Sequence, residues 1–201
     1  MLLHLPLAKL SHWQRVAFSA VLIERMLPNY QLFSQSTEFG DVSILRNQLN
    51  LVWQWLDKNN RTKINVDAQL AKLEEQIPAP EDYDFFGVQP ALDAAMALTQ
   101  LLQALKDKEV DGFANVSLLS QNSVTAYVQL LLLQEMSEQE AEQAEFTKGQ
   151  LQDHPLGQWE IDSQNEAFDF IKNAPENKAS CDKLKALVVE PGLSNLGIEV
   201  S

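Results

Sequence analysis

Residues 90–106 read PALDAAMALTQLLQALK, and this stretch decides the fold class. Between Ala91 and Leu105 the side chains are apolar nearly all round, and Asp93 is the only charged residue. Pro90 suits the first turn of a helix, where its missing N–H has no intrahelical partner in any case. Because a helix that is apolar on every side is normally buried, we predict that residues 90–106 form the central helix of an all-α protein.

The segment before this centre predicts a long helix from Ser11 to Leu27. Its inward face holds residues at steps of three and four, namely Trp13, Ala17, Ala20, Glu24 and Leu27. Pro28 is expected to start a second, short helix from Pro28 to Ser36, and Phe39-Gly40 ends this segment, with Gly40 suited to a left-handed C-cap. Asp41 is then a natural N-cap for a helix from Val42 to Leu56.

Helical patterns also fill the remaining sequence. Asp67 is expected to cap a short helix, Asp111-Gly112 to separate the central helix from the next one, and Ser137-Glu138-Gln139-Glu140 to form a capping box. Two more helices are expected after Pro155 and after Pro175. With only 7 Gly and 8 Pro and no alternating strand pattern, the sequence predicts one domain, residues 1–201, built as an irregular bundle of about eight helices.

The charge balance excludes some partners and favours others. The net charge is −13, and residues 137–201 contribute −8 of it, with 13 acidic and 5 basic residues. Such a surface repels phosphate groups, so we expect no nucleic-acid partner. A protein partner, basic in character, or a second copy of the chain is compatible with this charge.

The sequence predicts a cytoplasmic protein that does not enter a membrane. Its single cysteine, Cys181, fits a reducing compartment, and the N-terminus has no basic region of the kind that precedes a signal sequence. The longest uncharged stretch runs from Phe113 to Gln134 and contains five Asn and Gln residues. These amides are costly to place in lipid, so a buried core helix is the better interpretation.

Several segments together resemble the YjaG family of gamma-proteobacteria and their relatives. They are Trp13-Gln14, Glu24-Arg25-Met26-Leu27-Pro28-Asn29-Tyr30, Phe39-Gly40-Asp41, Asn65 to Leu70, Ile77-Pro78, Phe86 to Ala94 and Ser194 to Ile198. The resemblance spans nearly the whole chain, although residues 143–186 show no clear motif. It implies an all-helical fold of unknown biochemical function and supplies no catalytic residues.

The patterns that mark common catalytic and metal sites are absent from the sequence. There is no Cys-x-x-Cys pair and no glycine-rich phosphate loop, and the histidines His4, His12 and His154 form no metal-binding spacing. Cys181 stands beside Asp182, which disfavours a thiolate. We therefore predict no metal and no cofactor, and the sequence favours a protein that is not an enzyme.

Six polar residues are candidates for a ligand site or an internal polar cluster: Glu24, Arg25, Asn29, Tyr30, Asp41 and Asp93. Glu24 lies on the inward face of the first helix, so its carboxylate needs a partner. Arg25 is one helical step aside, which makes Arg46 a candidate for that partner. Asp93 is expected in the first helical turn, where the helix dipole favours a negative charge. Asn29 and Tyr30 are expected to form hydrogen bonds across a helix junction.

Trp53 and Trp55 raise the question of a contact surface. Two residues apart on one helix, they face directions about 160° apart. At most one of them fits the core, and Trp55 is the candidate for a half-exposed contact residue.

Two functional hypotheses follow. The first is a non-catalytic interaction module with an acidic surface, which predicts an exposed apolar patch above roughly a few hundred Å² beside the acidic C-terminal helices. The alternative is a small-ligand-binding protein or enzyme in which Glu24, Asp41 and Asp93 surround one cavity, with Arg25 or Tyr30 as orienting groups. These carboxylates would act as acid and base or hold a divalent ion, and they must converge in one pocket.

Overall fold

The computed structural model describes residues 2–199 and shows an all-α domain. Over this range nine α-helices and two short 3-10 helices occur, and the only β feature is an isolated bridge between Leu193 and Glu199. The α-helices are α1 (His12–Thr37), α2 (Val42–Leu56), α3 (Val66–Glu74), α4 (Val88–Asp107), α5 (Val110–Gln134), α6 (Glu138–Ala141), α7 (Lys148–Asp153), α8 (Pro155–Asn173) and α9 (Lys178–Val188). The 3-10 helices are η1 (Leu7–Lys9) and η2 (Pro80–Asp82). The predicted fold class is thus confirmed.

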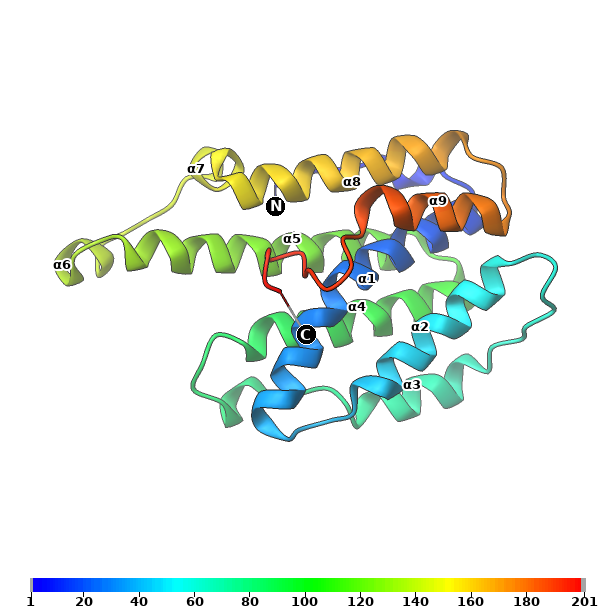
Figure 1. Cartoon of the computed structure of the whole chain (residues 1–201), viewed down its shortest axis with the longest axis horizontal. Coiled ribbons are helices and arrows are strands. Elements are labelled where there is room, and N and C mark those ends of the chain that lie inside the picture. The colour runs from blue at the N-terminus through cyan, green and yellow to red at the C-terminus, as the bar shows by residue number, and fades with distance from the viewer. Residues whose placement is uncertain (1, 200–201) are drawn as a thin grey trace.

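The helices lie in three tiers (Figure 1). Helices α8 and α9 form the upper tier of the view, α5 and the first half of α1 lie below them, and α2, α3 and α4 form the lower tier. Helix α1 runs through the bundle and packs against α2, α4, α5, α8 and α9. The end of α5 projects past the bundle and carries α6 at its tip.

Helix α1 is longer than the sequence predicted, because Pro28 lies inside it and does not start a new helix. A proline in a helix interior removes one hydrogen bond and typically costs about 3 kcal/mol. Side chains on both sides of Pro28 are fully buried, including Met26 before it and Tyr30 and Phe33 after it. Packing of the two halves on the same core outweighs the lost hydrogen bond.

Other predicted caps and boundaries also differ from the structure. The left-handed C-cap of α1 is Glu38, with φ 58°, and Gly40 takes φ 70° in the following turn. Asn65 caps α3, which leaves Asp67 in its first turn. Gly112 lies within α5, and Asn177 rather than Pro175 caps α9. In α3 and α9 the correct cap is a nearby asparagine, whose side-chain oxygen accepts a backbone N–H three residues on.

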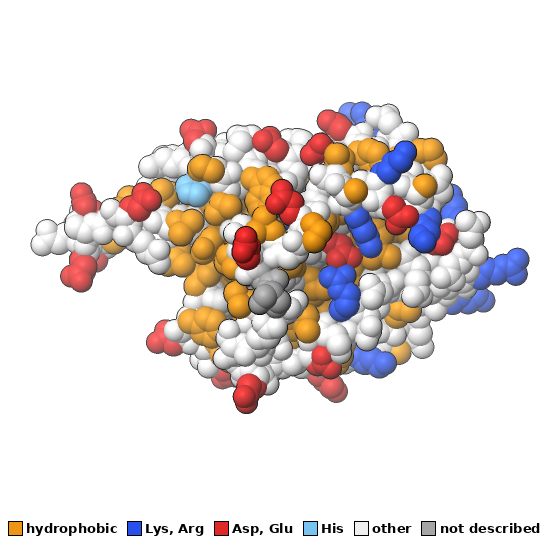
Figure 2. All heavy atoms as spheres, in the orientation of Figure 1, with side chains coloured by type: hydrophobic (Ala, Val, Ile, Leu, Met, Phe, Trp, Pro, Cys, Tyr) orange, Lys and Arg blue, Asp and Glu red, His pale blue; other side chains and the backbone are white. Residues whose placement is uncertain are grey.

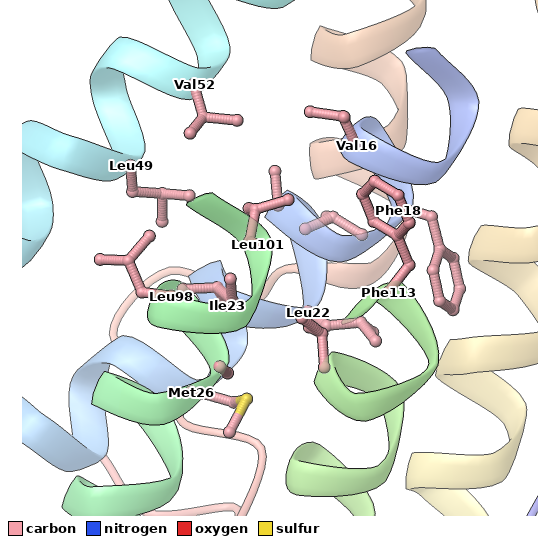
Figure 3. Packing of buried hydrophobic residues seen from close by; sticks show 14 of the residues in the cluster. Val16, Phe18, Leu22, Ile23, Met26, Leu49, Val52, Leu98, Leu101 and Phe113 are labelled. Carbon is pink, nitrogen blue, oxygen red and sulfur yellow. The ribbon is translucent and has the colours of Figure 1, made fainter. Parts of the chain in front are cut away.

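The core is built on α4, as predicted, together with α1. Figure 3 shows Val16, Leu22 and Ile23 of α1 meeting Leu49 and Val52 of α2, Leu98 and Leu101 of α4 and Phe113 of α5. A smaller cluster joins α5 to both ends of the chain through Leu2, Val124, Val128, Leu151 and Leu196. By length and composition α5 would also suit a membrane span, and 39% of its most apolar window is buried within the bundle.

Candidate functional site

Arg25 and Glu160 form an ion pair in the centre of the protein. Nη1 of Arg25 lies 2.6 Å from Oε2 of Glu160, and the two side chains are 1% and 0% exposed. Trp159 covers the guanidinium, with 4.6 Å from Cζ to the ring centroid. The second carboxylate oxygen of Glu160 accepts hydrogen bonds from Ser120 at 2.5 Å and Gln164 at 2.7 Å. The pair is therefore shielded from solvent, and its contacts come from three helices, α1, α5 and α8.

Asn195 connects this pair to Asn29. Nδ2 of Asn29 donates to Oδ1 of Asn195 over 2.8 Å, and Nδ2 of Asn195 donates to Oγ of Ser120 over 3.2 Å. The backbone N–H of Asn195 also donates to the carbonyl of Arg25 over 2.7 Å. Asn29 thus binds the C-terminal segment to α1. The sequence had predicted hydrogen bonds across a helix junction instead.

Glu24 lies apart from the buried pair, on the side of α1 that faces α2 and α9. Its carboxylate accepts hydrogen bonds from Nη1 of Arg46 at 2.7 Å and from Nε1 of Trp53 at 2.7 Å, and Nζ of Lys185 lies 3.6 Å away. The inward position of Glu24 and its pairing with Arg46 are confirmed. A cavity of about 280 Å³ adjoins this ion pair and is bordered by Gln31 and Glu190.

Tyr30 and Asp41 meet at Gln76. The Tyr30 hydroxyl donates to the backbone carbonyl of Gln76 over 2.8 Å, and the side-chain oxygen of Gln76 accepts the N–H of Asp41 at 2.8 Å. Asp41 caps α2 as predicted, by accepting the N–H of Ser43, and hydrogen bonding from the side chain and then the backbone of Ser43 lowers the pKa of its carboxyl. Burial raises the pKa of the Tyr30 phenol to about 12. The hydroxyl therefore stays protonated and acts as a hydrogen-bond donor.

Asp93 is not in the first helical turn, because α4 begins at Val88 and not at Pro90. The side chain is 3% exposed and accepts hydrogen bonds from Ser123 at 2.7 Å and Gln89 at 3.1 Å. Burial raises the pKa of this carboxyl, and the two hydrogen bonds lower it in part. The partner of Asp93 is therefore a serine of α5, and not the helix dipole.

These residues are divided among four separate groups of partners. Arg25 and Asn29 belong to one network, whereas Glu24, Asp93 and the Tyr30–Asp41 pair each have partners of their own. Across residues 2–199, no group of three or more His, Cys, Asp or Glu side chains is arranged to hold a metal ion. Each of the six polar candidates thus forms at least one hydrogen bond or ion pair within the fold.

Trp55, the predicted contact residue, is half-buried, and so is Trp53. The ring of Trp55 lies edge-on to His12, with 5.7 Å between centroids.

Burial raises the pKa of the Cys181 thiol to about 11, which keeps it protonated.

A second feature, which the sequence did not indicate, is an apolar groove of about 220 Å³. It lies between the end of α1, residues 85–90 at the start of α4, and the C-terminal segment. Two of the four large hydrophobic side chains exposed within residues 2–199 border it, Leu32 at 39% and Phe85 at 44%. We call this feature the Phe85 groove; it is lined by Asn29, Leu32, Phe33, Ser36, Phe85, Phe86, Gly87, Pro90, Leu196 and Ile198.

The similarity to known proteins extends over almost the whole chain. A family model described as "Protein of unknown function (DUF416)" matches residues 3–199. The chain belongs to the DUF416 family. This DUF416 protein is 39% identical over 197 residues to uncharacterized protein YjaG of Salmonella typhimurium, covering 98% of the chain and 95% of the relative.

Uncharacterized protein YjaG of Escherichia coli is 38% identical over 201 residues, with 98% and 95% covered. A crystal structure of a DUF416 family protein from Shewanella baltica matches with a TM-score of 0.83 at 32% identity, covering 98% of this chain and all of that one. The predicted resemblance to the YjaG family is confirmed, and the DUF416 fold is shared by a solved structure.

Sequence reasoning missed Glu160, although a signal for it exists. The buried residues of α8 include Gly157, Glu160, Gln164 and Ile171, at steps of three, four and seven. This stripe marks Glu160 as an inward carboxylate by the same argument that identified Glu24. The Phe85 groove had no such signal, because it is formed by three segments that are distant in the sequence.

Proposed function

We propose that this chain is a non-catalytic module that binds a protein partner through the Phe85 groove. One observation carries the proposal: Leu32 and Phe85 are large, exposed and apolar, and they border the same groove. Exposed hydrophobic side chains scattered singly need no explanation, but a concave group of them is typical of an interaction site.

The internal pairing of the polar candidates supports a role that is not catalytic. Glu24, Arg25 and Asp93 each bind a partner within the fold, although Nε and Nη2 of the buried Arg25 have no hydrogen-bond partner among the described residues. The same proposal places the protein in the cytoplasm without a nucleic-acid partner, on the strength of its single cysteine and its net charge of −13.

The test is cross-linking from within the groove. A photoreactive phenylalanine analogue replaces Phe85, and the cells that naturally make the protein are irradiated. We expect a discrete adduct with a second protein that weakens when Leu32→Ser is introduced in the same chain. The matched control carries the analogue at Gln103, an exposed position in the second half of α4.

Identical adducts from positions 85 and 103 would contradict the proposal, because contact would then not depend on the groove. The absence of any adduct from position 85 would contradict it as well. Circular dichroism of the Leu32→Ser protein, compared with wild type, ensures that loss of the adduct does not reflect unfolding.

A further inference from the structure

The wall of the Phe85 groove is preformed. The Phe85 ring stacks on Phe33, with 6.0 Å between centroids and 19° between planes, and it meets Tyr83 edge-on at 6.3 Å. Phe33 is itself 1% exposed, so the stack rests on the core. The neighbouring ring of Phe86 lies against Tyr127 of α5, with centroids 5.4 Å apart. An aromatic wall whose rings are already packed on one another needs less ordering when a ligand binds, which favours affinity.

Gly87 gives the Phe85 ring its space. A Cβ at this position would come within 2.5 Å of Cε2 of Phe85. The backbone of Gly87 has φ −57°, which an alanine adopts without strain. Gly87→Ala therefore displaces the ring while leaving the start of α4 able to form.

The residues that line the groove are all uncharged. Within two positions of them along the chain, the exposed charged side chains are carboxylates only: Glu38, Asp84 and Glu199. Figure 2 shows one face, where Lys and Arg gather toward the right, Asp and Glu lie on both sides, and the left carries hydrophobic side chains with Asp and Glu but without Lys or Arg.

We infer that the Phe85 groove binds a basic amphipathic helix of a protein partner, whose large apolar side chains enter the groove while its Lys and Arg residues face the surrounding carboxylates. Charge complementarity identifies this occupant, because an acidic surround attracts a basic segment and repels an acidic one. A second copy of the chain is disfavoured, since each copy carries −13. This inference rests on the proposed function and names the partner's chemistry.

The geometry of the groove favours a helix as the bound segment. Helix α1 forms one side of the groove and residues 85–90, which lead into α4, form another, and no lining residue belongs to a β-strand that could pair with a bound strand. A groove of about 220 Å³ holds one or two large side chains. Apolar residues three or four positions apart on a helix project together in this way.

The test uses two dye-labelled synthetic peptides that share the same leucine positions at helical spacing. One peptide has Lys at every polar position and the other has Glu. We expect the Lys peptide to bind at least about tenfold more tightly in anisotropy titrations and to weaken as salt is raised, because salt screens exposed charges. We expect Phe85→Ser and Gly87→Ala to weaken the Lys peptide about tenfold or more, and the matched control Gln103→Ser to leave it unchanged.

Equal affinity for the two peptides would overturn the basic partner but not the groove, which the cross-linking from position 85 tests independently. Equal binding of the Lys peptide to wild type and Phe85→Ser would show attraction by general charge, and would also overturn the inference. Sedimentation of the free protein that reveals a dimer abolished by Phe85→Ser would make the occupant a second copy and would refute the basic helix.

Discussion

Glu160→Gln tests whether the buried ion pair stabilises the fold. The change keeps the shape of the side chain but removes the carboxylate that neutralises Arg25, and both side chains are at most 1% exposed. Breaking one partner of such a pair typically costs about 3–5 kcal/mol, because an uncompensated charge is left in the core. At roughly 2–4 °C per kcal/mol for a chain of this size, Tm should fall by about 6–20 °C.

The double variant Arg25→Met with Glu160→Leu separates the pair from the rest of the core. Apolar residues of similar volume often replace a buried ion pair at little net cost. We therefore expect the double variant to lose clearly less stability than the sum of Arg25→Met and Glu160→Leu in denaturant titrations. Asp67→Asn, which breaks the exposed pair with Lys106, is the control and should leave the unfolding midpoint essentially unchanged. Additive single effects, or a Glu160→Gln midpoint equal to wild type, would refute the reasoning.

Three further predictions concern other buried groups. Trp13→Ala should lower the free energy of unfolding by about 3–5 kcal/mol in urea titrations, because it removes a ring that is 6% exposed and whose N–H donates to the Leu56 carbonyl. Glu24→Gln should lower the midpoint by more in low salt than in high salt, since it removes a partly screened ion pair; a loss that does not vary with salt would contradict this. Asp93→Asn should be as stable as wild type or more so at neutral pH, because burial raises the pKa of Asp93, and this relative gain should disappear as the pH falls below its ordinary value of 3.8.

The direction of the Asp93 effect follows from proton binding. A carboxyl whose pKa is raised in the folded state binds a proton more readily there than in the unfolded chain. Its contribution to stability is therefore fully present below pH 3.8 and is lost as the pH rises through the raised pKa. An amide suits the site, since Ser123 can accept from it and donate to the Leu119 carbonyl, which lies 3.3 Å from the serine hydroxyl. An Asp93→Asn protein that is markedly less stable than wild type at pH 7 would contradict this account.

Local sequence patterns predicted where the helices lie, whereas tertiary packing determined whether a helix continues past a proline. The apolar centre at residues 90–106 and the capping of α2 by Asp41 were predicted because each depends on neighbours within a few residues. Pro28 misled the prediction, since a rule about local backbone cost says nothing of the tertiary burial on both sides of it. The partner of Glu24 was predictable because a single base, Arg46, lies in the facing helix.

The groove could not be predicted for a related reason. Leu32, Phe85 and Ile198 each look ordinary in the sequence, and only the fold brings them to one place. The exposed fraction of a side chain depends on which distant segment covers it. Acidity, by contrast, was visible from composition, and each of the three segments that line the groove has an exposed carboxylate within two positions of its lining residues.

The buried polar network and the Phe85 groove are connected through Asn29 and Asn195. Asn29 stands at their boundary, because its side chain lines the groove and also holds Asn195, which reaches the buried pair through Ser120. Asn195 precedes Leu196, which lines the groove in turn. The polar network thus fixes the C-terminal segment against α1, and this segment completes one side of the groove. The shape of the Phe85 groove therefore depends on a buried polar network that includes Ser120 and Glu160, which do not line the groove.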